Sequence, residues 1–114
     1  MDSKVKAWLF DIDNAIEEIN SFLDGRAKDY FEYQQDLILK RAIERELEII
    51  GEAMNRLIKS DPSFIDKITD AKDIIGLRNQ VIHAYDNISA ENIWAIVINH
   101  LPLLKSEVSN LLNE

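Results

Sequence analysis

The sequence predicts an all-α protein, an antiparallel bundle of four to five helices that forms a single domain over residues 1–114. Its 114 residues include only three glycines and two prolines, so few positions favour turns. Apolar residues recur every three or four positions over long stretches, which is the spacing of one buried helix face. Hydrophobic residues make up 46% of the chain, enough for a core of its own.

Composition limits the classes of function. The chain has no cysteine, which excludes disulfides and thiolate metal sites. No apolar run approaches the roughly 18 residues of a membrane span, and the start Met1-Asp2-Ser3-Lys4 lacks the apolar core of a signal peptide. We therefore expect a cytoplasmic protein without membrane contact. A net charge of -8 repels nucleic acid on average, so any contact with RNA requires a local basic site.

The first expected helix starts at Asp2 or Ser3, either of which can cap it, and ends at Gly25. Its buried stripe is Val5, Trp8, Leu9, Ile12, Ala15, Ile16, Ile19, Phe22 and Leu23. The acidic residues Asp11, Asp13, Glu17 and Glu18 are expected on its solvated face. Residues 26–35 are predicted to form a connector or a short helical turn, whose Tyr30, Phe31 and Tyr33 could stack on bases but more readily cover one end of the bundle.

A second long helix is expected over residues 36–59, ended by Ser60-Asp61-Pro62. Gly51 lies inside it, where a glycine costs about 1 kcal/mol relative to alanine, so we expect a close helix contact there. Glu46 falls at the edge of the apolar arc and is a possible partner for Arg78, whereas Glu48 and Glu52 fall on the far side.

The second half of the chain is expected to hold two or three more helices. Residues 63–70 form a connector with Phe64, Ile65 and Ile68 as core residues. A third helix runs from Lys72 through the segment 78–85 and stops at Asp86-Asn87. Ser89 caps a fourth helix, and Pro102 either kinks it or starts a new helix that reaches Leu112.

Residues 78–85 interrupt the apolar pattern with an arginine, a histidine and a tyrosine. At about 100° per residue, Arg78 lies about 40° from Ile74 and therefore points into the apolar arc. Arginine keeps its charge in proteins, so an inward guanidinium requires a carboxylate, a phosphate or a wet cavity. This stretch is therefore the candidate site.

Arg78 and His83 are five residues apart, about 140° around a regular helix. They can meet at one phosphate only where the helix ends or where two subunits bring their motifs together. The chemistry that needs such a pair is RNA cleavage, in which histidine transfers protons and arginine stabilises the phosphate charge. No carboxylate and histidine cluster has metal-ligand spacing, so neither a metal nor a cofactor is expected. The spacing alone favours a capping or interface histidine over a catalytic one.

The pattern of Arg78, Asn79, His83 and Tyr85 resembles the Arg-x4-His-x-Tyr signature of the HepT-like branch of the HEPN family. The resemblance extends over roughly residues 5–112. It includes residues 42–53, which are similar to the family's Leu-Glu-Ile-Ile-Gly-Glu-Ala helix, and the pairs Gly76-Leu77, Ile93-Trp94 and Leu101-Pro102.

The resemblance implies an α-helical toxin of a toxin–antitoxin module, a ribonuclease that acts on RNA without a metal as a homodimer with a shared cleft. Its partner would be a minimal nucleotidyltransferase antitoxin. Arg78 and His83 would be catalytic, Asn79 would support the site, and Tyr85 would receive AMP from the antitoxin. The AMP group would then block RNA by charge and bulk.

Two other functions stay open at this point. In one, the bundle chiefly binds the nucleotidyltransferase or a nucleotide and cleaves little, which the acidic net charge favours. In the other, the chain is a helical dimerisation module with no site.

Overall fold

The structure of the protein, a computed structural model, describes residues 1–26, 28–82 and 87–114. These ranges are helical with short connections and contain no strand, which confirms the all-α class. In chain order the helices are α1 (Ser3–Leu23), α2 (Tyr30–Gln35), α3 (Leu37–Ser60), α4 (Phe64–Lys67), α5 (Ala71–Ile75), α6 (Leu77–Ile82), α7 (Asn87–Asn99) and α8 (Leu101–Leu112).

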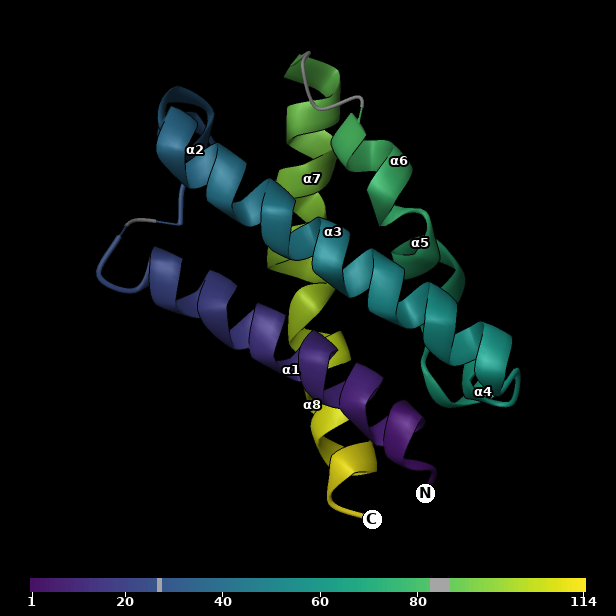
Figure 1. Ribbon diagram of the computed structural model, residues 1–114. Coiled ribbons are helices and arrows are strands. Elements are labelled where there is room, and N and C mark those ends of the chain that lie inside the picture. The colour runs from purple at the N-terminus through teal and green to yellow at the C-terminus, as the bar shows by residue number, and fades with distance from the viewer. Residues whose placement is uncertain (27, 83–86) are drawn as a thin grey trace.

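The two longest helices, α1 and α3, run antiparallel and form one layer, which α7 and α8 cross on its far side (Figure 1). The short helices α5 and α6 lie along the other edge of α3. One continuous core joins these elements. Its fully buried members include Leu9, Ile12, Ile16, Ile19, Ile43, Leu47, Ile50, Met54 and Leu57 from α1 and α3.

Both long helices begin at an aspartate that caps them. The Asp2 carboxylate accepts a hydrogen bond from the Lys4 amide at 2.7 Å, and the Asp36 carboxylate accepts one from the Leu39 amide at 3.0 Å. Each bond satisfies an amide that has no partner in the first turn of a helix. Beyond α1, Gly25 takes a φ of 75°, a conformation that favours glycine. The expected ends of both helices are therefore confirmed.

The connector between α1 and α3 forms the short helix α2, which covers one end of the bundle. Tyr33 is 1% exposed and its ring stacks on Trp94 of α7, with 4.8 Å between ring centroids. This arrangement confirms the expectation that an aromatic side chain of the connector covers the bundle, whereas Phe31 is exposed.

The prediction for residues 63–70 was right for two of three core residues. Phe64 and Ile68 are buried, but Ile65 is 37% exposed because it lies on the outer side of the single turn α4. Two polar contacts fix the connection: the Thr69 hydroxyl donates to Glu107 Oε2 of α8 at 2.8 Å, and Asp70 Oδ2 lies 3.0 Å from Nδ1 of His100, the residue between α7 and α8.

The expected third helix is in fact two. It breaks at Gly76, where ψ is -5° instead of the roughly -42° of an α-helix. The Gly76 amide donates to the Asp73 carbonyl at 3.1 Å, the tighter pattern that ends α5. Glycine has low helix propensity, so it accommodates this change of direction. The side-chain direction of residues after Gly76 therefore cannot be counted from Ile74.

Two details of the last helices differ from expectation. Helix α7 begins at Asn87, so Ser89 lies inside it and is not its N-cap; Asp86 lies outside the described residues. Pro102 starts a new helix, α8, in whose first turn its missing amide costs nothing.

Further along α8, Lys105 Nζ binds Asp13 at 2.6 Å and Glu17 at 2.7 Å. These two acids of α1 thus hold α8 instead of facing only solvent.

The helices of the described ranges include none with a stretch long and apolar enough to cross a membrane.

Candidate functional site

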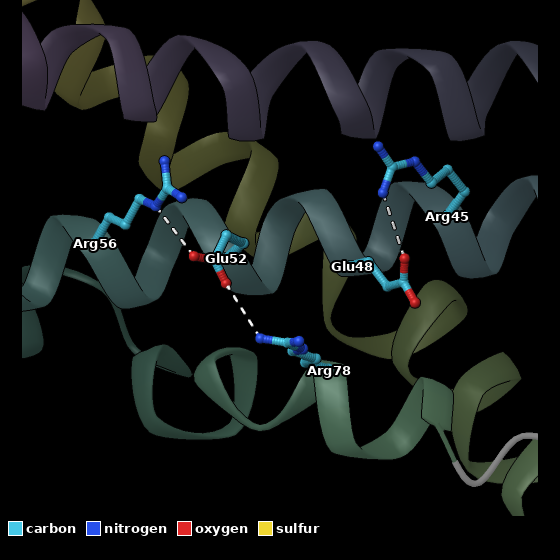
Figure 2. A network of polar contacts seen from close by, with 5 residues as sticks. All are labelled: Arg45, Glu48, Glu52, Arg56 and Arg78. Carbon is cyan, nitrogen blue, oxygen red and sulfur yellow. Dashed lines mark hydrogen bonds and ion pairs between the residues drawn. The ribbon is translucent and has the colours of Figure 1, made fainter.

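Arg78 is the second residue of α6, and its side chain is 69% exposed. The inward orientation expected from the helical wheel is therefore wrong. The break at Gly76 turns α6 relative to α5, so Arg78 points along the surface beside α3 (Figure 2). A guanidinium in that position keeps its hydration and can bind a ligand from solvent.

Gly51 sets the position of Arg78. A Cβ atom at Gly51 would lie 3.3 Å from the Ile74 carbonyl oxygen, 3.3 Å from Leu77 Cβ and 3.4 Å from the Arg78 amide nitrogen. The junction of α5 and α6 therefore packs directly on the bare backbone of α3. This confirms the expected close contact at Gly51 and identifies its partner as the segment that carries the motif.

Glu52, the residue after Gly51, faces two arginines with one carboxylate. Its Oε2 lies 3.9 Å from Arg78 Nη1, and its Oε1 accepts a hydrogen bond from Arg56 Nε at 3.0 Å (Figure 2). The first distance is an ion pair too long for a hydrogen bond. Glu52 thus orients Arg78 across two helices without occupying its donors.

Glu46, the carboxylate expected to pair with Arg78, does not lie near it. It lies on the opposite edge of α3, beside Glu18 of α1, and is 7% exposed. Burial raises the pKa of the Glu46 carboxyl, and the neighbouring Glu18 raises it further. The proposed pair of Glu46 and Arg78 is therefore wrong, because the change of direction at Gly76 brings Arg78 to Glu52 instead.

A second ion pair lies further along the same face of α3. Arg45 Nη1 is 3.4 Å from Glu48 Oε2, and Figure 2 shows this pair apart from the Glu52 cluster. Arg45, Glu48, Glu52 and Arg56 all line a shallow groove of about 230 Å³ between α1 and α3, with Trp8 on its α1 side.

The remaining predicted site residues are only partly described. Asn79 is exposed on α6, next to Arg78. His83 and Tyr85 lie outside the described residues, so their distances to Arg78 stay predictions. The described part of α6 reaches Ile82.

Sequence reasoning missed Glu52 and Arg56 as parts of this cluster. Glu52 and Arg56 are four residues apart, a spacing that pairs opposite charges on one helix face, and Glu52 follows the glycine expected at a close contact. Those two signals together point to Glu52. Across the described ranges, no three histidine, aspartate or glutamate side chains gather in a way that could hold a metal ion.

Comparison with known proteins covers nearly the whole chain. The family model described as Ribonuclease HepT-like matches residues 12–111. A Methanocaldococcus jannaschii protein named "Putative RNase MJ1380" is 38% identical over 106 residues, which cover 91% of this chain and 93% of the relative.

Two further relatives have similar names. "Putative RNase TTE0752" of Caldanaerobacter subterraneus is 34% identical, covering 82% of this chain and 84% of its own. "Probable ribonuclease HepT" of Thermococcus cleftensis is 31% identical, covering 93% and 94%. No solved structure matches the chain significantly.

Proposed function

The chain belongs to the HepT-like ribonuclease family, and from this premise we propose that it is the toxin of a toxin–antitoxin module, a metal-independent endoribonuclease. The observation that supports the proposal most is the exposed Arg78 guanidinium, which Glu52 orients on a tightly packed crossing of two helices. A solvent-accessible arginine whose donors are not taken up by hydrogen bonds among the residues that the structure describes suits the binding of an RNA phosphate.

In the proposed reaction the 2′-hydroxyl oxygen of RNA attacks the adjacent phosphorus, and the bond from phosphorus to the 5′-oxygen breaks. The products are a 2′,3′-cyclic phosphate and a 5′-hydroxyl. Arg78 binds the phosphate and stabilises the charge of the transition state. His83 takes the proton of the 2′-hydroxyl or gives one to the 5′-oxygen, which suits an imidazole because its unperturbed pKa is about 6.5. Asn79 supports the site.

We further propose that the protein acts as a homodimer. Arg78 and His83 would lie about 140° apart on a continuous helix, so a single regular helix cannot present both to one phosphate. Two subunits that join their motifs would form a shared cleft in which an arginine and a histidine meet.

The proposed regulation uses Tyr85. A minimal nucleotidyltransferase antitoxin would join the Tyr85 hydroxyl oxygen to the α-phosphorus of ATP, with pyrophosphate as the leaving group. The attached AMP brings negative charge and bulk into the cleft and thereby excludes RNA.

A second candidate function is a non-catalytic module that binds the nucleotidyltransferase or a nucleotide. The net charge of -8 favours it, since a strongly acidic protein repels RNA at long range.

The decisive experiment measures RNA cleavage by purified, unmodified protein in the presence of EDTA. We expect cleavage by the unaltered protein and a loss of at least about 100-fold in Arg78→Ala and His83→Ala, the scale on which removal of a charge-stabilising group or a general acid–base acts. Both variants should also lose growth inhibition on expression.

Arg45→Ala is the matched control, since it removes the same charge from a neighbouring exposed pair. Circular dichroism checks that all variants keep the helical fold. Full cleavage or full toxicity in both Arg78→Ala and His83→Ala would refute the enzymatic role and favour the binding module.

The role of Tyr85 has a separate test by intact mass spectrometry. After co-expression with the nucleotidyltransferase encoded beside it, the protein should gain mass in whole AMP units and lose its cleavage activity. Tyr85→Phe should gain none, because it lacks the acceptor hydroxyl. A Tyr85→Phe protein that is still modified and silenced would move the modification to another residue.

A further inference from the structure

Arg56 shares the carboxylate of Glu52 with Arg78, although the two arginines come from different helices. The two guanidiniums meet opposite oxygens of that single carboxylate, at 3.0 Å and 3.9 Å. The two arginines carry permanent positive charges and share the one Glu52 carboxylate, while Asp11 of α1 also lines the groove beside Arg56.

The donors of both arginines are available to a ligand. Arg56 binds Glu52 through Nε, and within the described ranges its terminal Nη groups form no hydrogen bond. Arg78 is held only by the longer ion pair. The side chains are 61% and 69% exposed. Because Arg56 Nε is bound to Glu52, its two Nη groups are the donors that could bind two phosphate oxygens.

We infer that Arg56 is a second phosphate-binding residue, which holds the RNA backbone next to the phosphate bound by Arg78. This inference rests on the proposed function and adds to it a contact outside the reacting atoms. Arg56 takes no part in bond breaking; it supplies binding and register, and Glu52 pairs with both guanidiniums. A single strand suits this contact, because its flexible backbone can follow two cations that come from different helices.

Arg45 offers a matched comparison on the same helix face. It lines the same groove and carries the same charge, and it also pairs with a glutamate. It lies eleven residues before Arg56, about 16 Å along α3, and its partner is Glu48 instead of Glu52. A general attraction of RNA to the groove would depend on both arginines equally, whereas the proposed contact depends on Arg56 alone.

The test measures binding of a fluorescent single-stranded RNA in which every 2′-hydroxyl is methylated, so that the attacking hydroxyl is absent and no cleavage occurs. Affinity is followed by anisotropy as a function of salt. Each phosphate contact to a single strand contributes about -0.7 to the slope of log K against log salt. We expect Arg56→Ala to make the slope less negative by about 0.7 and to weaken binding about fivefold at 0.1 M salt.

Arg56→Lys should keep the slope, because the charge remains, and Arg45→Ala should match the unaltered protein. The double variant Arg56→Ala with Glu52→Gln removes one charge of each sign. Its slope of log K against log salt should still be less negative, by the same amount as in Arg56→Ala. That result would assign the change to the lost Arg56 contact, and not to a Glu52 carboxylate left without its partner.

Three outcomes overturn the inference. An unchanged slope in Arg56→Ala shows that Arg56 contacts no phosphate, and equal losses in Arg45→Ala and Arg56→Ala show only a general attraction. A double variant whose slope equals that of the unaltered protein shows that the change in Arg56→Ala came from the unpaired Glu52 carboxylate. Each of these three outcomes leaves the proposed function intact, provided that the unaltered protein binds the methylated RNA and cleaves ordinary RNA. If the unaltered protein does neither, both proposals fail.

Discussion

Glu46 of α3 is a buried carboxyl group that lies beside another glutamate. Its Oε2 is buried and has no hydrogen-bond partner in the described part of the chain, and Glu18 lies beside it. The raised pKa of Glu46 means that the folded state holds a proton more tightly than the unfolded chain does. Stability from this group is therefore present below the ordinary glutamate pKa of about 4.3 and is lost as pH rises through the higher folded-state pKa.

We expect Glu46→Gln to stabilise the protein at pH 7.5 by about 1 kcal/mol, the lower end of the cost of an unsatisfied buried polar group. The gain should shrink toward zero at pH 4, where Glu46 is largely protonated. Urea denaturation at both pH values measures this, and Glu48→Gln, on the more exposed face, is the control. A gain of equal size at both pH values would show that charge burial is not the cause.

For single residues, the sequence predicts which side chains need a partner better than it predicts where those side chains point. The wheel placed Glu46 at the edge of the apolar arc, where it is, and selected Arg78 as a residue that needs an anionic partner. It failed on the identity of that partner, because angles along a wheel hold only while the helix is continuous. Gly76 breaks that continuity two residues before Arg78.

Among the elements, the crossing of α3 with the junction of α5 and α6 controls the site. Gly51→Ala would gain up to about 1 kcal/mol of helix propensity, but its Cβ would meet the backbone of Ile74 and Arg78 at 3.3 to 3.4 Å. The backbone cannot rotate away as a flexible side chain can, so α6 must shift.

We expect Gly51→Ala to change the free energy of unfolding by less than about 1 kcal/mol, since the two effects offset each other. With Arg78 in its proposed role, RNA cleavage should fall at least about tenfold, because small displacements of a group that binds the reacting phosphate are costly. Urea denaturation and cleavage assays on the same preparation check this. Unchanged cleavage would show that the position of Arg78 tolerates the shift.

The long helices could be predicted from sequence, and the short ones could not. Helices α1 and α3 have capping aspartates, sustained stripes and clear stops, so the sequence predicts their limits to within one or two residues. Helices α4 and α5 are too short for a stripe, and tertiary contacts fix them: Gly51 on one side, and the bonds of Thr69 to Glu107 and of Asp70 to His100 on the other.

For the whole molecule, the proposed homodimer predicts a specific interface. Ile82, at the end of α6, is 57% exposed, and a dimer that joins the two motifs would cover it. We expect sedimentation to give twice the chain mass of 13.2 kDa, and Ile82→Asp to give the monomer with little cleavage, because a charge in a packed interface is costly.

Ile38→Asp is the control. Ile38 is 84% exposed and precedes Gly51, where α6 crosses α3, by thirteen residues, about 20 Å along the helix. A monomeric unaltered protein that cleaves RNA would rule out a shared cleft.

The bare backbone at Gly51 also has a genetic consequence. Every single-base change of a glycine codon that alters the residue introduces a side chain or a stop, and any side chain here pushes on the segment that carries Arg78. A toxin of the proposed kind could therefore lose activity through a change at a codon far from the motif in the reading frame, with every reacting group left in place.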